Sequence, residues 1–396
     1  MEHGCRKNAP IGRFGVTDLP AASGFAAFRR AVLDPGAADC AFHHAADRFV
    51  DVVPHGLRQG RAMFGPGRSV NRGMQETPIH RLKRVSSLVL DNAILSPGSM
   101  AVLSPERGFF DASVDNLAIW GNRLSAVDSN FIEADSGGWT WADPGQTIPD
   151  IDAIGIPVCG VGIANYGHFF YDGLPAALLH RRLLGPRAVL AGPPLRAWQA
   201  EILDALGLRE SYIALDRPAW FRKLVVSNMM SFNVSYPSRF IRAVFDSLRF
   251  RFGTGAGNRL RLLISRDAPE NRRVMENRPE IEAIAARFGF AVIQPAGMSV
   301  ADQARLFARA DCVIGESGAA LANLGFCDPG TTVLEIQPDC FPDGWTRAAC
   351  HVLGLRWHGF FVVATGEVRD RPAHEFGFAV DPVSFRDALA TVFPKR

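Results

Sequence analysis

The stretch DCVIGESGAALANLGFCDPGTTVLEI, residues 311–336, decides the fold of the chain. It begins with an apolar run at residues 311–315, which predicts a buried strand. A Gly-containing turn and a short helix over residues 319–326 follow, and a second apolar run at residues 332–336 predicts another strand. A strand, a helix and a strand in this order indicate two parallel strands joined by a covering helix.

The same alternation extends upstream of this stretch. It predicts strands at residues 260–265 and 291–294 and helices at residues 277–288 and 299–310. Asn277 and Ser299 would cap the two helices, and Asp302 completes a capping box with Ser299. We therefore expect residues 258–396 to form a Rossmann-like domain with a parallel sheet.

The preceding region, residues 86–252, is predicted to form a second α/β domain with a β-rich entry. Strands are expected at residues 86–90, 99–103, 117–120, 156–163, 188–191 and 223–227, and helices at residues 195–206 and 237–250. The first three strands lie between glycine turns, which indicates a small antiparallel unit. The segment GTGAG, residues 253–257, is typical of a linker. Residues 1–85 show no clear pattern and are treated as a separate N-terminal region.

Composition places the chain among folded globular proteins. Its 396 residues are too many for one ordinary core and favour two domains. A hydrophobic fraction of 47% and a charged fraction of 21% supply enough apolar surface for both. The formal net charge of +3 is small for this length, which argues against a nucleic-acid partner.

Apolar runs and the spacing of cysteines and histidines predict the compartment of the protein and whether it needs a metal. No run of 18 apolar residues occurs, so no membrane span is expected. The 7 cysteines are scattered without a C-x-x-C pair, which is typical of a reducing cytoplasm. The 10 histidines show no ligand spacing such as H-E-x-x-H, so we expect no metal cofactor.

The turn GESGAALAN, residues 315–323, is a candidate phosphate site. Gly315 and Gly318 would let the backbone approach a ligand closely. The start of the following helix offers N–H groups and a positive dipole end, and Ser317 could add a hydroxyl donor. The alternative is a tight turn in which glycine serves packing alone.

The segment SRDAPENRRVMEN, residues 265–277, follows the strand that is expected at residues 260–265. Arg266, Arg272 and Arg273 could bind the oxygens of a pyrophosphate and stabilise a departing diphosphate. A solvated basic loop is the alternative. The cluster and the glycine turn share one predicted sheet edge, which favours function. Glu335 ends a strand at that edge and would accept ribose hydroxyls or pair with an arginine.

A third candidate site lies in NYGHFFYDGLP, residues 165–175. Asn165 would cap a short helix, and His168 and Asp172 are four residues apart, which places them on one helical face. Pro175 is expected to end or kink that helix. One of the pair could take a proton from an attacking hydroxyl while the other orients it. The alternative is an ordinary helix start with a surface carboxylate.

Taken together, these three blocks resemble family 61 glycosyltransferases, which include proteins of the bacterial capsular-polysaccharide type. Residues 165–179 are similar to the family's N-x-x-H-x-x-x-D-x-L-P block, and residues 262–277 to its block with I-S-R, R-R and N-E. Residues 289–336 are similar to the stretch that ends in H-G-A-G-L-x-N and a later Glu. The resemblance covers residues 90–340.

The resemblance implies a GT-B-like fold, with two Rossmann-like domains facing a cleft and a small β-rich N-terminal region. It also implies an inverting transfer from a nucleotide sugar without a metal. His168 and Asp172 would be catalytic, with Asn165 on the acceptor side. The donor residues would be Arg266, Arg272, Arg273, Ser317, Gly318, Asn323 and Glu335.

The chain departs from the family pattern at three points. The family's His is Ser317 here, its second Gly is Ala320, and the N-E pair has the reversed order Glu276-Asn277. These departures motivate an alternative, a catalytically impaired nucleotide-binding scaffold of the same fold. An epimerase is disfavoured, because neither G-x-G-x-x-G after the first strand nor Tyr-x-x-x-Lys occurs.

The sequence thus predicts a cytoplasmic glycosyltransferase that acts in bacterial surface polysaccharide or glycoconjugate synthesis. Its partners would be a nucleotide-sugar donor and a glycan or other hydroxyl acceptor, without nucleic acid. Peripheral association with a membrane is compatible with this prediction.

Overall fold

The computed structural model describes most of the chain. It covers residues 12–35, 37–44, 63–66, 84–113, 128–133, 139–141, 148–232, 237–255, 257–266, 273–339, 344–365 and 376–393. These residues form two compact units. Unit 1 holds the described residues of 12–44, 84–232 and 238–244, and unit 2 holds those of 63–66, residue 237 and those of 245–393. The predicted boundaries at 85/86 and 252/258 stay predictions.

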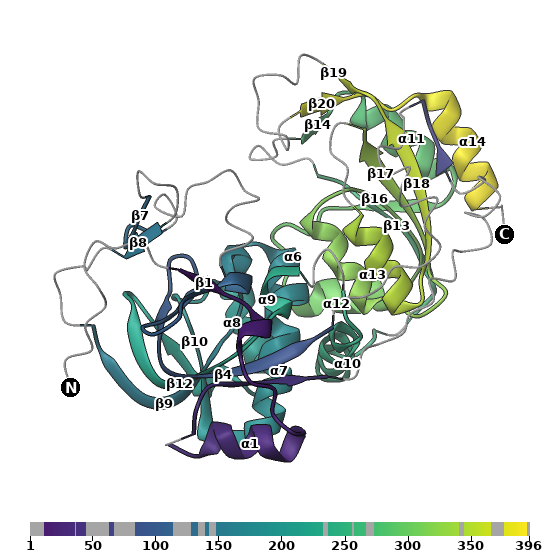
Figure 1. The fold of residues 1–396 in the computed structure, drawn as a ribbon. Helices are drawn as coiled ribbons and strands as arrows, with labels where there is room; N and C mark the ends of the chain where they lie inside the picture. The colour runs from purple at the N-terminus through teal and green to yellow at the C-terminus, as the bar shows by residue number, and fades with distance from the viewer. Residues whose placement is uncertain are drawn as a thin grey trace. The chain divides into compact units, whose positions relative to one another are not determined.

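Unit 1 is built on a nine-stranded mixed sheet (Figure 1). Its strands are β1 (Arg13–Phe14), β2 (Cys40–His43), β4 (Ser86–Ser96), β5 (Ala101–Ser104), β6 (Gly108–Phe110), β9 (Asp150–Pro157), β10 (Ala188–Gly192), β11 (Tyr212–Ala214) and β12 (Ala219–Ser227). Strands β11, β10, β9 and β12 are parallel neighbours in this order. In chain order this is 3-2-1-4, which is a Rossmann-like arrangement with its switch point between β9 and β12.

The antiparallel strands of unit 1 continue this sheet. β4 pairs antiparallel with β12, and β2 and β5 pair antiparallel with β4. The predicted antiparallel pairing is confirmed for β4 and β5, β6 extends it, and the pairing of β4 with β12 joins these strands to the parallel ones in one continuous sheet. A separate hairpin of β7 (Phe131–Glu133) and β8 (Trp139–Trp141) stands beside it. The strand predicted at residues 117–120 lies outside the described residues.

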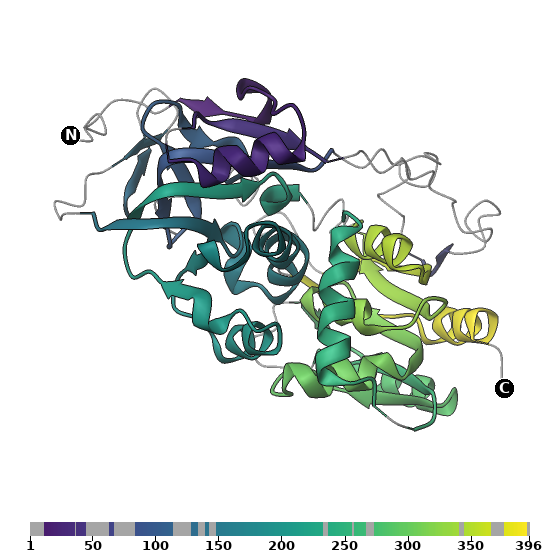
Figure 2. The ribbon, with the colours of Figure 1, turned by 90° about the horizontal axis from the view of Figure 1, so that it is seen from below.

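The following helices belong wholly or in part to unit 1. They are α1 (Phe25–Leu33), α6 (Tyr166–His168), α7 (Leu174–Leu184), α8 (Ala197–Ala205), α9 (Met229–Phe232) and α10 (Phe240–Phe252), whose second half belongs to unit 2. Helix α1 packs on β2 and β4, along which it lies in Figure 2, and α7 packs on β9, β10 and β12. The second half of β9 is buried at four successive residues, as expected for a strand covered on both faces.

The region after β9 differs from its prediction. The strand ends at Pro157, and residues 161–164 form a 3-10 turn instead of the strand predicted through residue 163. Gly160 lies against the backbone of Met230, where an added Cβ would come within 2.5 Å of the Met230 carbonyl oxygen. This close approach turns the chain away from the sheet toward the segment that carries His168.

Unit 2 contains a six-stranded parallel sheet with the order β15-β13-β16-β17-β18-β3. Its strands are β3 (Met63–Phe64), β13 (Leu260–Ile264), β15 (Phe290–Ile293), β16 (Ala310–Glu316), β17 (Thr332–Pro338) and β18 (Arg356–Val362). The first five positions give the order 2-1-3-4-5 in chain order, the second common doubly wound arrangement. Its switch point lies between β13 and β16, which are paired in parallel.

Helices lie on both faces of this sheet. They are α11 (Arg278–Arg287), α12 (Val300–Ala308), η6 (Ala319–Phe326, of the 3-10 type), α13 (Trp345–Leu353) and α14 (Pro382–Val392). Helices α11 and α14 pack together on one face, and α12 and α13 contact η6 on the other (Figure 1). A small sheet of β14 (Arg273–Met275), β20 (Phe376–Phe378) and β19 (Ala364–Thr365) completes the unit.

Most predicted elements of unit 2 are confirmed, and the α/β class with parallel sheets is confirmed for the chain. Ser299 caps α12 as predicted, accepting from the backbone N–H of Asp302. Asn277 occupies the position before α11, but its side chain does not cap that helix. It exchanges two hydrogen bonds with the backbone of Val380 instead, at 2.8 and 3.0 Å.

Candidate active site

A His–Asp pair follows the carboxyl end of β9, at the switch point of the unit 1 sheet. Asn165 accepts hydrogen bonds from the backbone N–H groups of Gly167 and His168, as predicted for a cap. His168 Nδ1 donates to Asp172 Oδ2 over 2.7 Å. The Asp172 side chain is only 2% exposed, and the His168 side chain is 14% exposed. The imidazole thus lies at the surface with a buried carboxylate behind it.

The backbone between the two residues is a π-helix, η3 (Phe169–Gly173), in which Leu174 N–H reaches the carbonyl of Phe169. Pro175 was predicted to end or kink the helix. It does not end it, since α7 continues to Leu184. In a regular α-helix the Pro175 ring would clash with the carbonyl four residues back, and the wider π-turn gives it room. Single π-turns inside helices are frequent at functional sites.

Two glycines make room for the pair. A Cβ on Gly162 would come within 2.5 Å of His168 Cγ, so the ring lies directly against the Gly162 backbone. A Cβ on Gly173 would collide with the carbonyl oxygen of Val158 at the end of β9. The pair is therefore fixed against the edge of the sheet by backbone contacts.

The buried carboxylate of Asp172 also affects the neighbouring thiol of Cys159. Burial raises the pKa of the Cys159 thiol well above its usual range, and the charge of Asp172 raises it further. Since Nδ1 is occupied by Asp172, a proton exchanged with a substrate would use Nε2. A carboxylate in this position fixes the ring orientation and stabilises the imidazolium that forms when the ring takes a proton.

The second group of predicted residues meets at the switch point of unit 2. Arg266 follows β13, Arg273 begins β14, and Ser317 follows β16. Arg266 Nη1 and Arg273 Nη1 both donate to the carbonyl oxygen of Ser317, over 2.9 and 2.7 Å. A Cβ on Gly318 would collide with Arg266 Nη1, so the glycine leaves room for the guanidinium at the start of η6.

The side chain of Ser317 is directed inward. Its hydroxyl donates to Glu335 Oε1, and Trp357 Nε1 donates to Glu335 Oε2 over 2.8 Å. Glu335 is completely buried and Ser317 is 1% exposed. Whether Ser317 and Glu335 bind a donor stays a prediction. Trp357 was not singled out by the sequence, which contains no local signal for its contact with Glu335.

A buried ion pair supports the same turn and was also missed from the sequence. Arg278, the first residue of α11, donates to Glu316 Oε1 over 2.6 Å. Burial lowers the pKa of Arg266; Glu316 opposes this shift, whereas the charge of Arg278 adds to it. Arg266, Arg278 and Glu316 are therefore electrostatically coupled at the edge between β13 and β16.

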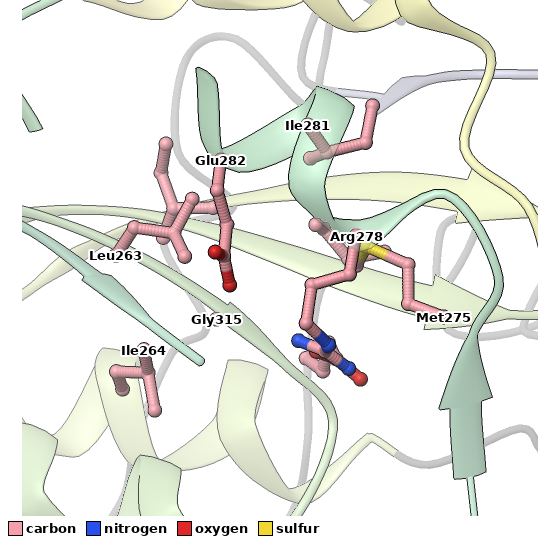
Figure 3. Close-up of a pocket in the computed structure, with 10 residues that line it drawn as sticks. Leu263, Ile264, Met275, Arg278, Ile281, Glu282 and Gly315 are labelled. Atoms are coloured by element: carbon pink, nitrogen blue, oxygen red, sulfur yellow. The ribbon is translucent and has the colours of Figure 1, made fainter. Parts of the chain in front are cut away.

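The cavity beside this ion pair is too small for a nucleotide. Figure 3 shows Arg278 and Glu282 reaching from α11 toward the strand that carries Gly315. The cavity measures about 10 Å³, which is about enough for one water and far below the size of a small-molecule pocket. A donor would have to bind outside it, on the side of Ser317 and Gly318.

The remaining predicted residues are placed as follows. Asn323 is fully buried in η6 and donates to Gln303 Oε1 on α12 over 2.7 Å. Arg272 lies outside the described residues. The structure thus brings Arg266, Arg273, Ser317 and Gly318 together in unit 2, with Glu335 behind them. It brings His168, Asp172 and Asn165 together in unit 1.

The described part of the chain holds neither a side-chain cluster suited to a metal ion nor a helix suited to crossing a membrane. Within that part, no cluster of three or more His, Cys, Asp or Glu side chains could hold a metal ion. None of its helices is both long and apolar enough to span a bilayer.

The fold and the two sites define the class of the protein. Polar groups at the switch points of doubly wound sheets are typical of α/β proteins that bind nucleotide-like ligands. Residues 166–334 match the family described as Glycosyltransferase 61. The resemblance predicted from the sequence is thereby confirmed, and the protein is a glycosyltransferase. No curated protein matches the chain.

Proposed function

We propose that the protein transfers a sugar with inversion from a nucleotide-sugar donor to a hydroxyl acceptor. The observation that carries this proposal is the convergence of two guanidiniums, from Arg266 and Arg273, on the Ser317 carbonyl. They lie at the switch point of a doubly wound sheet, where such folds bind their ligands. A GT-B-type arrangement of two Rossmann-like domains belongs to the same proposal.

In unit 2 the arginines would hold the diphosphate of the donor. Guanidinium groups carry several N–H donors in a planar fork that matches phosphate oxygens. As the glycosidic bond to the nucleotide breaks, the leaving diphosphate gains negative charge, which fixed cations stabilise. Arg272 would add to this group, and Asn323 and Glu335 would support the turn. We propose no metal ion or organic cofactor for this step.

In unit 1 His168 would act as the base. The acceptor hydroxyl gives its proton to Nε2 while its oxygen attacks the anomeric carbon, and the nucleoside diphosphate leaves with the bonding electron pair. Asp172 holds the ring and stabilises the resulting imidazolium. The His168–Asp172 pair favours catalysis over the scaffold alternative, because a scaffold does not need an imidazole backed by a buried carboxylate.

We further propose that this reaction takes place in the cytoplasm, in the synthesis of bacterial surface polysaccharide or glycoconjugate. The scattered cysteines without a C-x-x-C pair support a reducing compartment. A glycan hydroxyl would be the acceptor, with peripheral membrane association where the acceptor is lipid-linked. Glycan analysis of cells that lack the protein tests this setting.

Calorimetry with UDP, GDP and dTDP tests the donor site. We expect one of them to bind the wild-type protein and Arg266→Ala to weaken its binding. Arg305→Ala, an exposed arginine on α12 of the same unit, is the matched control and should bind normally. Proton NMR of the product should show an inverted anomeric configuration. The proposal fails if none of the three nucleotides binds and Arg266→Ala leaves product formation unchanged.

A further inference from the structure

A chain of buried hydrogen bonds runs across three neighbouring strands toward the arginine pair. Trp357 on β18 donates to Glu335 on β17, and Glu335 accepts from the hydroxyl of Ser317 at the end of β16. Trp357 is 4% exposed and Glu335 is fully buried. Because a buried carboxylate is costly without hydrogen-bond donors, these two donors fix the position of the Glu335 side chain.

The sheet is shaped to let the indole reach Glu335. Glu335 is paired in register with Gly359 on β18. A Cβ on Gly359 would come within 2.8 Å of Trp357 Cη2 and of a ring carbon of Phe361, so the glycine leaves room for both rings. The guanidinium of Arg347 lies 5.8 Å from the centre of the indole ring, which is within cation–π distance. The indole is therefore held in the orientation that directs Nε1 to the carboxylate.

Ser317 is held by β17 at two points. Its backbone N–H donates to the carbonyl of Ile336 over 3.0 Å, and its hydroxyl donates to Glu335. With the N–H and the hydroxyl both fixed, the Ser317 carbonyl is directed outward to the point where Arg266 and Arg273 meet. The orientation of that carbonyl thus depends on Glu335, and the orientation of Glu335 depends on Trp357.

We infer that Trp357 is a positioning residue of the donor site, acting through Glu335 and Ser317 on the arginine pair. This inference rests on the proposed function, since it assigns the arginines to a nucleotide diphosphate. It explains how a serine occupies this turn: Ser317 serves the site through its carbonyl, while its hydroxyl is used inside the unit.

The test is Trp357→Phe, which removes the N–H and keeps an aromatic ring. We expect its affinity for the nucleoside diphosphate that the wild-type protein binds to fall about 5- to 20-fold, with KM for the donor rising in the same proportion. Ser317→Ala should give a similar loss, and the double variant should be no weaker than the worse single variant. Trp345→Phe, a buried tryptophan of the same unit, controls for general destabilisation and should bind normally.

A second measurement does not need the nucleotide. Hydrogen exchange of the backbone amides of residues 314–320 should be faster in Trp357→Phe and in Ser317→Ala than in Trp345→Phe. If the wild-type protein binds no nucleotide, the proposed function fails and exchange alone decides whether the relay exists. If nucleotide binds but Trp357→Phe binds it as tightly as wild type, the inference is overturned and the proposed function stands. Additive losses in the double variant would also overturn it.

Discussion

The two candidate sites are built in opposite ways. In unit 1 the pair His168–Asp172 comes from a single helical segment and lies four residues apart. In unit 2 the arginine pair is assembled from the ends of β13 and β16 and the start of β14, with its shared acceptor 51 and 44 residues away in the chain. The first arrangement suits a proton transfer between fixed atoms, and the second suits the binding of a ligand by groups from several elements. The comparison predicts a division of labour between chemistry in unit 1 and donor binding in unit 2.

The largest effect is expected from His168→Ala. It should lower kcat about 10²- to 10⁴-fold, because a general base contributes this much to a proton transfer. Affinity for the donor nucleotide should stay unchanged. Asp172→Asn should lower kcat in the same direction by disturbing the ring that it holds. Steady-state kinetics together with calorimetry measure both quantities, and a parallel loss of nucleotide affinity would contradict the division of labour.

The second expected effect is a loss of stability in acid, and it comes from a buried histidine of unit 1. His180 on α7 and His44 both contact the Ser87 hydroxyl, at 2.8 and 2.9 Å. Burial lowers the pKa of His180 to about 3, and His44 adds to the shift. The folded protein keeps His180 neutral, whereas the unfolded chain binds a proton below about pH 6.5. The stability from this group is therefore present above pH 6.5 and is lost as the pH falls toward 3.

This loss should reach about 2 kcal/mol of unfolding free energy between pH 7 and pH 5. Denaturant unfolding at the two pH values measures it. His180→Gln keeps an amide that can bond Ser87 but does not titrate, so its stability should depend less on pH in this range. If the unfolding free energy of the variant and of the wild-type protein changes equally with pH, His180 does not cause the loss of stability.

The third effect concerns the arginines and is expected to be smaller. Arg266→Lys should weaken nucleotide binding about tenfold, since an ammonium cannot reproduce the planar fork that a diphosphate accepts. The value of kcat at saturating donor should change less. Calorimetry with Arg305→Lys as the control variant separates this effect from a change in overall charge. Unchanged affinity in Arg266→Lys would mean that Arg266 acts only as a point charge or serves packing.

The contrast between the sites also explains what the sequence could predict. The His168–Asp172 pair was predictable, because helical spacing alone brings residues four apart together. Strands β13, β15, β16 and β17 of unit 2 were predictable, because their apolar runs alternate with predicted helices, whereas β3 and β18 of the same sheet were not predicted. Arg278 and Trp357 were missed since their partners lie 38 and 22 residues away, and no local pattern indicates such contacts.

The absence of a local signal for contacts between distant residues also explains where the predictions differ from the structure. The antiparallel pairing of the strands β4 and β5 was expected, but the sequence does not reveal that β4 also pairs with β12 more than 100 residues later. The helix was expected to end or kink at Pro175, since the cost of proline in an α-helix is a local rule. Gly173, the last residue of the π-turn, lies against the Val158 carbonyl, a contact that no local rule indicates.

The smallest effect is expected at Gly318, where the unit 2 site is most crowded. Gly318→Ala places a methyl group against Arg266 Nη1, which is the end of a flexible side chain and can shift. We expect nucleotide affinity to fall about three- to fivefold, which corresponds to roughly 1 kcal/mol. Gly207→Ala is the control in unit 1, because its Cβ would meet nothing within 4 Å although its φ of +66° disfavours alanine. It should cost stability without affecting binding. Equal nucleotide affinity in both variants would show that the position of Arg266 at the turn does not matter for the donor.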